Sequence, residues 1–216
     1  MSITLGLAEN YAMLGNKFLY LEDVIDVKGF MGSDFLSYSP LPGINSNGID
    51  LTGSIPNAPI VNGAAAKQAI ADVNTAIPLY QAVTPAYPPI TGPINLNATY
   101  ISPGRYDIIG DLTTNVDVTL YGTATSIYVF NVTGKIYITN NISLSGLLPQ
   151  NVIFIASDTV YIYNNVTVYG IYISTGNYAF IEGSALTGSE LTGRLICTGT
   201  AINAYTANQK STIIAP

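Results

Sequence analysis

The acidic residues are the first place to look for catalysis, because two neighbouring carboxylates can act as general acid and general base in glycosidic hydrolysis. Asp107, Asp111 and Asp117 form the nearest approach to an acidic cluster, and the stretch from Val118 to Ser157 contains no Asp or Glu. Asp is common in turns, which is the better interpretation of all three. The chain has no histidine, so Ser-His and Cys-His nucleophiles and histidine zinc sites are excluded. We therefore expect no enzyme activity and no catalytic residues.

Metal and thiol chemistry have little support either. Glu22, Asp23 and Asp26 offer the oxygen ligands that calcium prefers, but they lack the glycine-punctuated spacing of a calcium loop. Cys197 is the only cysteine, and Leu195-Ile-Cys-Thr contains no base or cation that would activate it. Its expected role is that of a small buried hydrophobic residue. We expect no metal site and no cofactor.

The charge pattern excludes two kinds of partner. The net charge is −6, and the seven Lys and Arg residues are scattered singly, whereas nucleic-acid binding needs clustered basic groups. Apolar runs end well before the roughly twenty residues needed to cross a bilayer as a helix. The first ten residues also lack the basic and apolar regions of a cleavable secretory signal. We expect no nucleic-acid partner and no transmembrane segment.

An internal repeat predicts the architecture. Residues 135–146 (KIYITNNISLSG) and 159–170 (TVYIYNNVTVYG) are near copies, twenty-four residues apart. A fixed period of this size is typical of stacked coils, and alternation of Ile or Val with Tyr, Thr or Ser is typical of strands with one buried face. Paired asparagines at 140–141 and 164–165 fall at the same phase, where they can form turns and stack. Together these features predict a β-helix.

Alternation assigns the side chains of the second half to two sets. The aliphatic and aromatic residues expected to face inward are Ile127, Val129, Ile136, Ile138, Ile142, Leu144, Val152, Phe154, Val160, Ile162, Val166, Val168, Ile171 and Ile173. Their expected outward neighbours are Tyr128, Tyr137, Tyr161, Tyr163, Thr167, Tyr169 and Tyr172.

The chain is expected to form one all-β domain over residues 1–216. Its parts would be short capping strands and loops (1–62), a helix (63–77), a Pro-rich connector (78–95) and the main coils (96–216). The helix is predicted over about 64–77, after Asn62-Gly63 and before Pro78. Its narrow apolar stripe contains Ala66, Ile70, Val73 and Ile77, which suits a helix lying along a sheet.

Several motifs resemble the ice-binding protein family of microbial and fungal β-solenoids. The matching segments are 5–15 (LGLAENYAMLG), the Ala-rich helix at 64–76, the Pro-Gly turn at 102–107, and strand segments at 128–131, 151–154 and 193–196. This resemblance implies a right-handed three-faced β-helix with one α-helix along its side. It also implies ice binding through a flat face that carries rows of Thr or other small polar residues.

Tyrosine stands where such a row would be expected. The second repeat and the residues directly after it carry Tyr161, Tyr163, Tyr169 and Tyr172, and the threonines form no regular ladder in the sequence. Tyrosine combines a large contact area with a hydroxyl and is enriched in interfaces. Our leading hypothesis is therefore a non-enzymatic structural protein that self-assembles into a filament, coat or surface layer through its tyrosine faces and terminal strands. The candidate contact residues are Tyr128, Tyr137, Tyr161, Tyr163, Tyr169 and Tyr172.

Two other functions stay open. One is an ice-binding protein that adsorbs to ice through a flat face of the β-helix. The other is a carbohydrate-binding or adhesive module that stacks sugars on its tyrosine rings. The expected partners are thus other copies of the chain, ice or glycans. The expected location is extracellular, or the surface of a cell, spore or virion.

Overall fold

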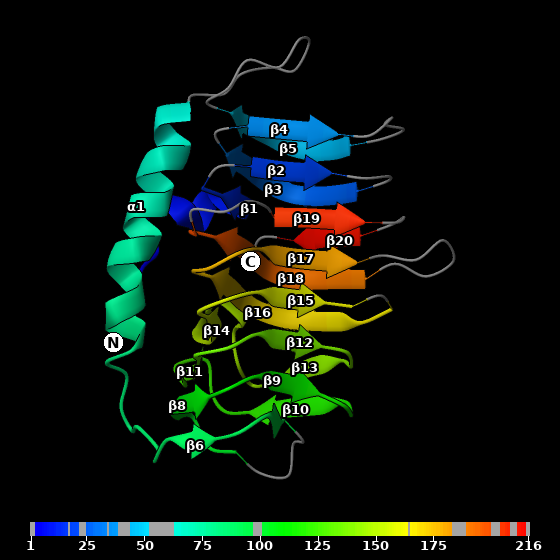
Figure 1. Ribbon diagram of the computed structural model, residues 1–216. Coiled ribbons are helices and arrows are strands. Elements are labelled where there is room, and N and C mark those ends of the chain that lie inside the picture. Colours follow the sequence, from blue (N-terminus) through cyan, green and yellow to red (C-terminus); the bar gives the residue numbers. More distant parts are fainter. Residues whose placement is uncertain are drawn as a thin grey trace.

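The predicted β-helix with one α-helix along its side is confirmed by the computed structural model (Figure 1). The structure describes residues 3–16, 18–21, 25–33, 35–38, 44–51, 63–96, 101–163, 165–182, 189–199, 204–207 and 211–214. All strand pairs in the described parts of the three sheets are parallel, as expected when each coil stacks on the next.

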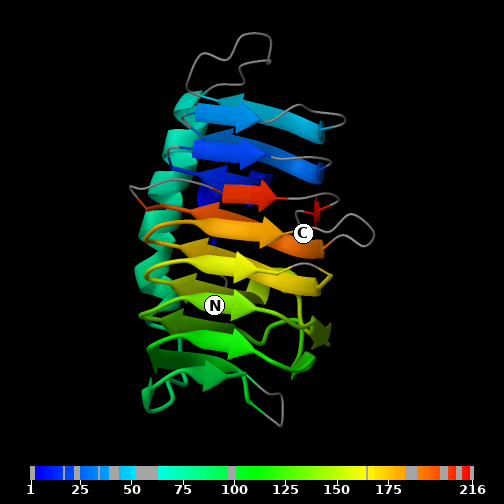
Figure 2. The ribbon, with the colours of Figure 1, turned by 45° about the vertical axis from the view of Figure 1, so that its right-hand side comes forward.

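One side of the β-helix, which we call face b, is an eight-stranded sheet (Figure 2). In spatial order its strands are β4 (Phe35–Tyr38), β2 (Phe18–Leu21), β19 (Ala204–Ala207), β17 (Ala179–Glu182), β15 (Val160–Ile162), β12 (Ile136–Ile138), β9 (Leu112–Thr114) and β7 (Ile94–Asn95).

The other two sides share long strands that bend at a corner. The ten-stranded sheet contains β1 (Tyr11–Gly15), β3 (Ile25–Ser33), β5 (Ile44–Leu51), β6 (Ile90–Thr91), β8 (Gly104–Ile109), β11 (Tyr128–Val132), β14 (Val152–Ala156), β16 (Thr167–Ser174), β18 (Ser189–Cys197) and β20 (Ser211–Ile214). A two-stranded sheet is formed by β10 (Val118–Tyr121) and β13 (Ile142–Ser145). We call these two sides face a and face c. The second half of β16 pairs with β14, and the second half of β18 pairs with β1; these halves belong to face a. The first half of β18 pairs with β20 and belongs to face c.

The corner between faces a and c depends on two glycines that lie opposite one another in β16 and β18. Gly170 has φ 128°, which side chains rarely adopt, and its register partner is Gly193. A Cβ on Gly193 would collide with the carbonyl oxygen of Gly170. Two coils can therefore turn this corner at close approach only because neither residue has a side chain.

The first and last strands, β1 and β20, both lie in the middle part of the stack. From β1 the chain winds toward one end through β2 to β5, and α1 (Gly63–Tyr80) then runs along the side toward the other end (Figure 1). The chain winds back from β6 to β20, so that β19 pairs with β2, and β20 lies between β18 and β3. The expected availability of the terminal strands for assembly is thus wrong, because both edges of β20 already pair within the chain and residues 3–5 are not a strand.

Helix α1 closes face a. Its buried stripe contains Ala66, Ala69, Ile70, Val73 and Ala76, where small side chains allow a close approach to the sheet. The predicted stripe is confirmed at Ala66, Ile70 and Val73. Pro78 does not end the helix as predicted: the helix continues for two more residues to Tyr80.

Continuation past Pro78 has a local cause. Tyr80 is only 2% exposed and packs in the cluster under the helix, and the amide of Gln81 still donates to the carbonyl of Ile77 at 2.9 Å. The packing of Tyr80 offsets the loss of a single backbone hydrogen bond at proline near the helix end.

Two apolar layers lie on either side of face a. The interior layer contains Tyr128, Phe130, Phe154 and Tyr172, and the layer under α1 contains residues such as Ile171. The outward orientation predicted for Tyr128 and Tyr172 is therefore wrong, since each is 0% exposed. Val129, Ile171 and Ile173 were expected in the interior and instead face the helix. The alternation of residue types could not show which side chains point into the interior here, because both sides of this sheet are apolar.

The buried aromatic rings form a row along the β-helix interior. The ring centroids of Tyr106 and Phe130 are 5.5 Å apart. The ring centroid of Phe154 lies 4.7 Å from that of Phe130 and 4.7 Å from that of Tyr172. The Tyr172 hydroxyl donates to the Tyr169 carbonyl at 3.2 Å, and the Tyr128 hydroxyl lies 2.9 and 2.8 Å from two carbonyl oxygens. Burial costs these tyrosines little because their hydroxyls meet backbone acceptors at the corners.

Candidate functional site

The three sides of the β-helix differ in what covers them. Face a is buried under α1, where Val129, Ile153 and Ile171 pack against the helix. No helix of the described residues covers faces b and c, so these are the sides that we consider for an extended partner (Figure 2). Face b is the broader, with eight parallel strands in one sheet.

An uncharged row runs along the middle of face b. One residue from each strand lies opposite the next, and in spatial order the register positions are Ser37, Tyr20, Tyr205, Phe180, Tyr161, Tyr137, Thr113 and Asn95. Its members Thr113, Tyr137, Tyr161 and Phe180 are half-buried, while their neighbours along each strand, such as Ile136 and Ile162, are completely buried. The row repeats at the spacing of parallel strands, about 4.8 Å.

Neighbouring aromatic rings of this row contact one another. The rings of Tyr137 and Tyr161 are stacked, with centroids 5.6 Å apart and planes 9° apart. Phe180 meets Tyr161 edge to face at 5.3 Å and 71°. Tyr137 and Tyr161 therefore each have one ring face directed toward the other ring.

Two more exposed tyrosines flank the row. Tyr163 is 37% exposed and lies 6.0 Å from Tyr161 between centroids, and Tyr178 is 39% exposed and lies 6.2 Å from Tyr161. Burial is the main cause that raises the pKa of Tyr161, so its hydroxyl stays neutral and can both donate and accept. Lys135 lies at the margin, where the neighbouring Tyr137 is the main cause that raises its pKa.

Face c has a different character. Thr119 pairs with Ser143, and Thr167 lies beside that strand, since its amide donates to the Asn141 side chain at 2.8 Å. The next register partner of Thr167 is Glu190, which places a carboxylate in this hydroxyl row. The row on face c therefore includes a charged residue, whereas the row on face b does not.

Three solved structures with the same fold come from Antarctic and Arctic microbes. An ice-binding protein from the Antarctic ascomycete Antarctomyces psychrotrophicus matches with TM-score 0.71 and 19% identity, covering 100% of this chain and 99% of that chain. An ice-binding protein from an Antarctic Flavobacteriaceae bacterium matches with TM-score 0.74 and 24% identity over 99% of this chain and 47% of that chain. An ice-binding protein with antifreeze activity from an Arctic yeast matches with TM-score 0.71 and 18% identity over 99% of this chain and 94% of that chain. Comparison with curated proteins gives no match.

The family model for ice-binding-like proteins matches residues 27–207. This chain belongs to the ice-binding-like family. The resemblance inferred from the sequence motifs is thereby confirmed, and the low identities above show a shared fold. Within the family fold, the present chain carries aromatic residues at the centre of its broadest open sheet.

The six candidate tyrosines do not form one surface. Tyr137, Tyr161 and Tyr163 gather on face b, Tyr169 lies half-buried on face c, and the other two lie in the interior as described above. Phe180 and Tyr178 belong beside them and were missed. The twenty-four-residue period reveals Tyr137 and Tyr161, but the next coil is shorter, which moves Phe180 to a spacing of nineteen residues.

The aspartates considered for catalysis hold neighbouring coils together. Asp107 accepts from Arg105 Nε at 3.0 Å and from the Asn131 side chain at 2.9 Å, and it lies within strand β8 rather than in a turn. Asp111 and Asp117 accept from the backbone amides of Lys135 and Asn141, at 2.8 and 3.0 Å. Each carboxylate thus has a structural partner one coil away.

Among the described residues no group of three or more His, Cys, Asp or Glu is placed to hold a metal ion. Glu22 and Asp23 lie outside the described residues. Cys197 is buried, and this burial is the main cause that raises the pKa of its thiol. No helix among the described residues is both long and apolar enough to span a bilayer.

Proposed function

We propose that this protein adsorbs to ice through face b. The observation that carries the proposal is the register-aligned row on the broadest open sheet, which contains no charged residue over eight strands. Because the row repeats at each coil, its residues are spaced regularly on a rigid sheet. Binding to a crystal requires such a regular and rigid surface. Membership of the ice-binding-like family and the ice-binding proteins with this fold support ice as the partner.

The ring geometry favours ice over sugars on this surface. Sugar stacking needs an accessible ring face, whereas Tyr137 and Tyr161 stack on one another and so have less ring face available. Neutral hydroxyls donate and accept hydrogen bonds and can order a layer of water. Ice adsorption also agrees with the extracellular location expected from the sequence, which remains part of the proposal.

A pair of matched variants tests both the function and the face. Tyr161→Arg places a long charged side chain in the middle of face b, and Thr167→Arg places the same side chain on exposed face c in the same coil. Thermal hysteresis and inhibition of ice recrystallisation are expected for the natural chain, to be abolished by Tyr161→Arg and to be retained by Thr167→Arg.

The opposite pattern would assign ice to face c, and a natural chain without either activity would remove ice as the partner. Circular dichroism of both variants checks that they are folded. Mass measurement by light scattering on the same samples shows whether copies associate through face b.

A further inference from the structure

A buried arginine on the helix side of the molecule has an unsatisfied donor. Arg194 lies in β18 opposite Ile171 and is 4% exposed. Its Nη2 donates to the carbonyl oxygen of Glu9 at 2.7 Å. Its Nε is buried and has no hydrogen-bond partner among the described residues. A buried charged donor without a partner costs free energy, so this guanidinium favours an acceptor beside it.

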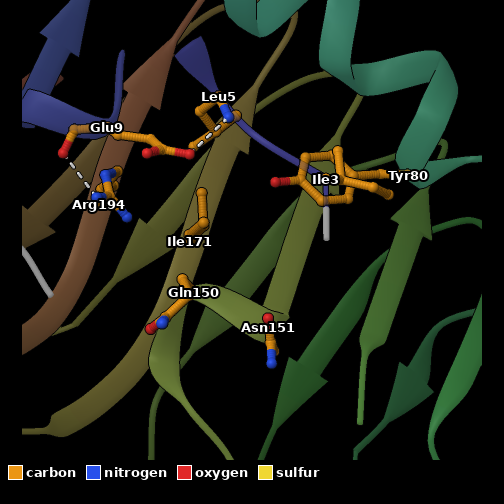
Figure 3. Close-up of a pocket in the computed structure, with 8 residues that line it drawn as sticks. All are labelled: Ile3, Leu5, Glu9, Tyr80, Gln150, Asn151, Ile171 and Arg194. Atoms are coloured by element: carbon orange, nitrogen blue, oxygen red, sulfur yellow. Dashed lines mark hydrogen bonds between the residues drawn. The ribbon is translucent and has the colours of Figure 1, made fainter. Parts of the chain in front are cut away.

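The arginine lines a cavity of about 260 Å³ (Figure 3). The cavity lies where the segment before β1, the end of α1, the short η2 helix (Pro149–Asn151) and the strands of face a meet. Its lining residues are Ile3, Leu5, Glu9, Tyr80, Gln150, Asn151, Ile171 and Arg194. Figure 3 shows Ile171 next to both Arg194 and Gln150.

We propose that this cavity binds a small monocarboxylate with a short apolar tail. A guanidinium offers a planar pair of N–H donors that fits the two oxygens of a carboxylate. Gln150 is exposed and can add a neutral amide donor from the η2 helix. Ile3, Leu5 and Ile171 supply an apolar wall for the tail.

The other charged group at the cavity limits the charge of the ligand. The Glu9 carboxylate accepts from the Thr4 hydroxyl at 2.7 Å and from the Leu5 amide at 3.2 Å, so its charge is partly satisfied. It does not pair directly with Arg194, whose contact to Glu9 is through the backbone oxygen. A carboxylate already at the rim repels a dianion more strongly than a monoanion, which disfavours sulfate and hydrogen phosphate.

The site is independent of the proposed ice face. It lies on the side covered by α1, whereas face b is a separate sheet. A ligand here would join the first residues of the chain to β18 and so stabilise the folded state. Loss of ice binding and loss of carboxylate binding are therefore separable outcomes.

Nuclear magnetic resonance provides a direct test on the full chain. Propionate is titrated at constant ionic strength against chloride, and the Arg194 Nε–H resonance is followed. Saturable shifts of this resonance are expected with propionate but not with chloride or sulfate. The unfolding temperature should rise by about 3 to 6 °C when propionate is at about ten times its Kd.

Three variants complete the test. Gln150→Glu adds a second carboxylate at an exposed position, so the fold should persist while propionate binding falls at least tenfold. Arg194→Gln should abolish binding. Arg105→Gln is the matched control, because Arg105 already pairs with Asp107 and this variant should bind propionate normally. An Arg194 resonance that does not respond to propionate, or an equal response in Gln150→Glu, would overturn the proposal.

Discussion

Tyrosine has two distinct structural roles in this protein. In the interior, Tyr172 stacks on Phe154 and donates its hydroxyl to a backbone carbonyl. On face b, Tyr161 stacks on Tyr137 and keeps its hydroxyl near solvent. The same side chain thus fills the β-helix core on one side of the coil and builds the outer surface on another.

Removal of the buried hydroxyl should therefore cost stability, while removal of the outer one should not. Tyr172→Phe is expected to lower the free energy of unfolding by about 1 kcal/mol, because the Tyr169 carbonyl loses its donor. Tyr161→Phe is the control and should change stability by less than about 0.5 kcal/mol. Urea unfolding followed by circular dichroism measures both. Equal stability of the two variants would mean that the buried hydrogen bond contributes nothing.

A second residue-scale prediction concerns alkaline pH. Burial is the main cause that raises the pKa of Tyr80 from 10.0 to about 12. The unfolded state therefore loses this proton at a lower pH than the folded state. The stability conferred by neutral Tyr80 is fully present below pH 10 and is lost as the pH rises from 10 to about 12.

Comparison with Tyr80→Phe isolates this effect from the other buried tyrosines. The natural chain should lose about 2 to 3 kcal/mol more than the variant between pH 9 and pH 12. Thermal unfolding across this range measures the difference. Parallel curves for the two proteins would show that Tyr80 titrates no differently in the folded state.

The candidate surface could be predicted only in part, for a reason visible in single residues. The repeat places Tyr137 and Tyr161 in equivalent positions, and the structure puts them side by side. Tyr128 and Tyr172 follow the same alternation, yet they point inward because α1 makes the other side of their sheet apolar too. A single sequence cannot reveal which sheet a helix will cover, so it cannot show which side chains of that sheet point into the interior.

At the scale of elements, the corners of the β-helix restrict the choice of residue more than the strands do. β16 and β18 each run over two faces, and the bend lies at Gly170 and Gly193. The glycine pair looks like an ordinary turn signal in the sequence. Only the stacking of one coil on the next shows that the two residues must both lack a side chain.

This corner predicts a large effect from one methyl group. Gly193→Ala should lower the free energy of unfolding by about 3 kcal/mol, because the new Cβ meets the Gly170 carbonyl oxygen and the coils must separate. Thr192→Ala, at the neighbouring half-buried position on face c, is the control and should be nearly neutral. Chemical unfolding of both proteins decides the matter, and a stable Gly193→Ala would show that the corner relaxes freely.

The helix could be predicted well except at its end. Small residues at helical spacing indicated both its position and its packing face, because a narrow stripe suits close approach to a sheet. The end was misplaced because burial of Tyr80 stabilises the turn beyond Pro78. That contact joins distant parts of the chain, so local propensity could not anticipate it.

At the scale of the whole molecule, stability depends on the meeting of the first and last coils. β20 pairs with β18 on one side and β3 on the other, and β19 pairs with β2. These pairs join strands that are far apart in the sequence. The coils formed by β1 to β5 and those formed by β6 to β20 should therefore unfold together rather than separately.

A chain that ends at residue 209 tests this dependence, because it lacks β20. Its unfolding temperature should fall by about 10 °C or more, since β18 and β3 both lose a paired edge on face c. A chain that ends at residue 214 keeps β20 and is the control. A shortened chain that melts within about 2 °C of the control would show that the closure is dispensable.

The side helix also sets how the family fold can lengthen. Its 18 residues extend about 27 Å, the height of between five and six coils at about 4.8 Å each. A duplication of one repeat would raise the stack by a single layer while the helix kept its span. Growth of the β-helix in evolution or by design should therefore require about three added helical residues for every added coil, so that length changes in the two parts are coupled.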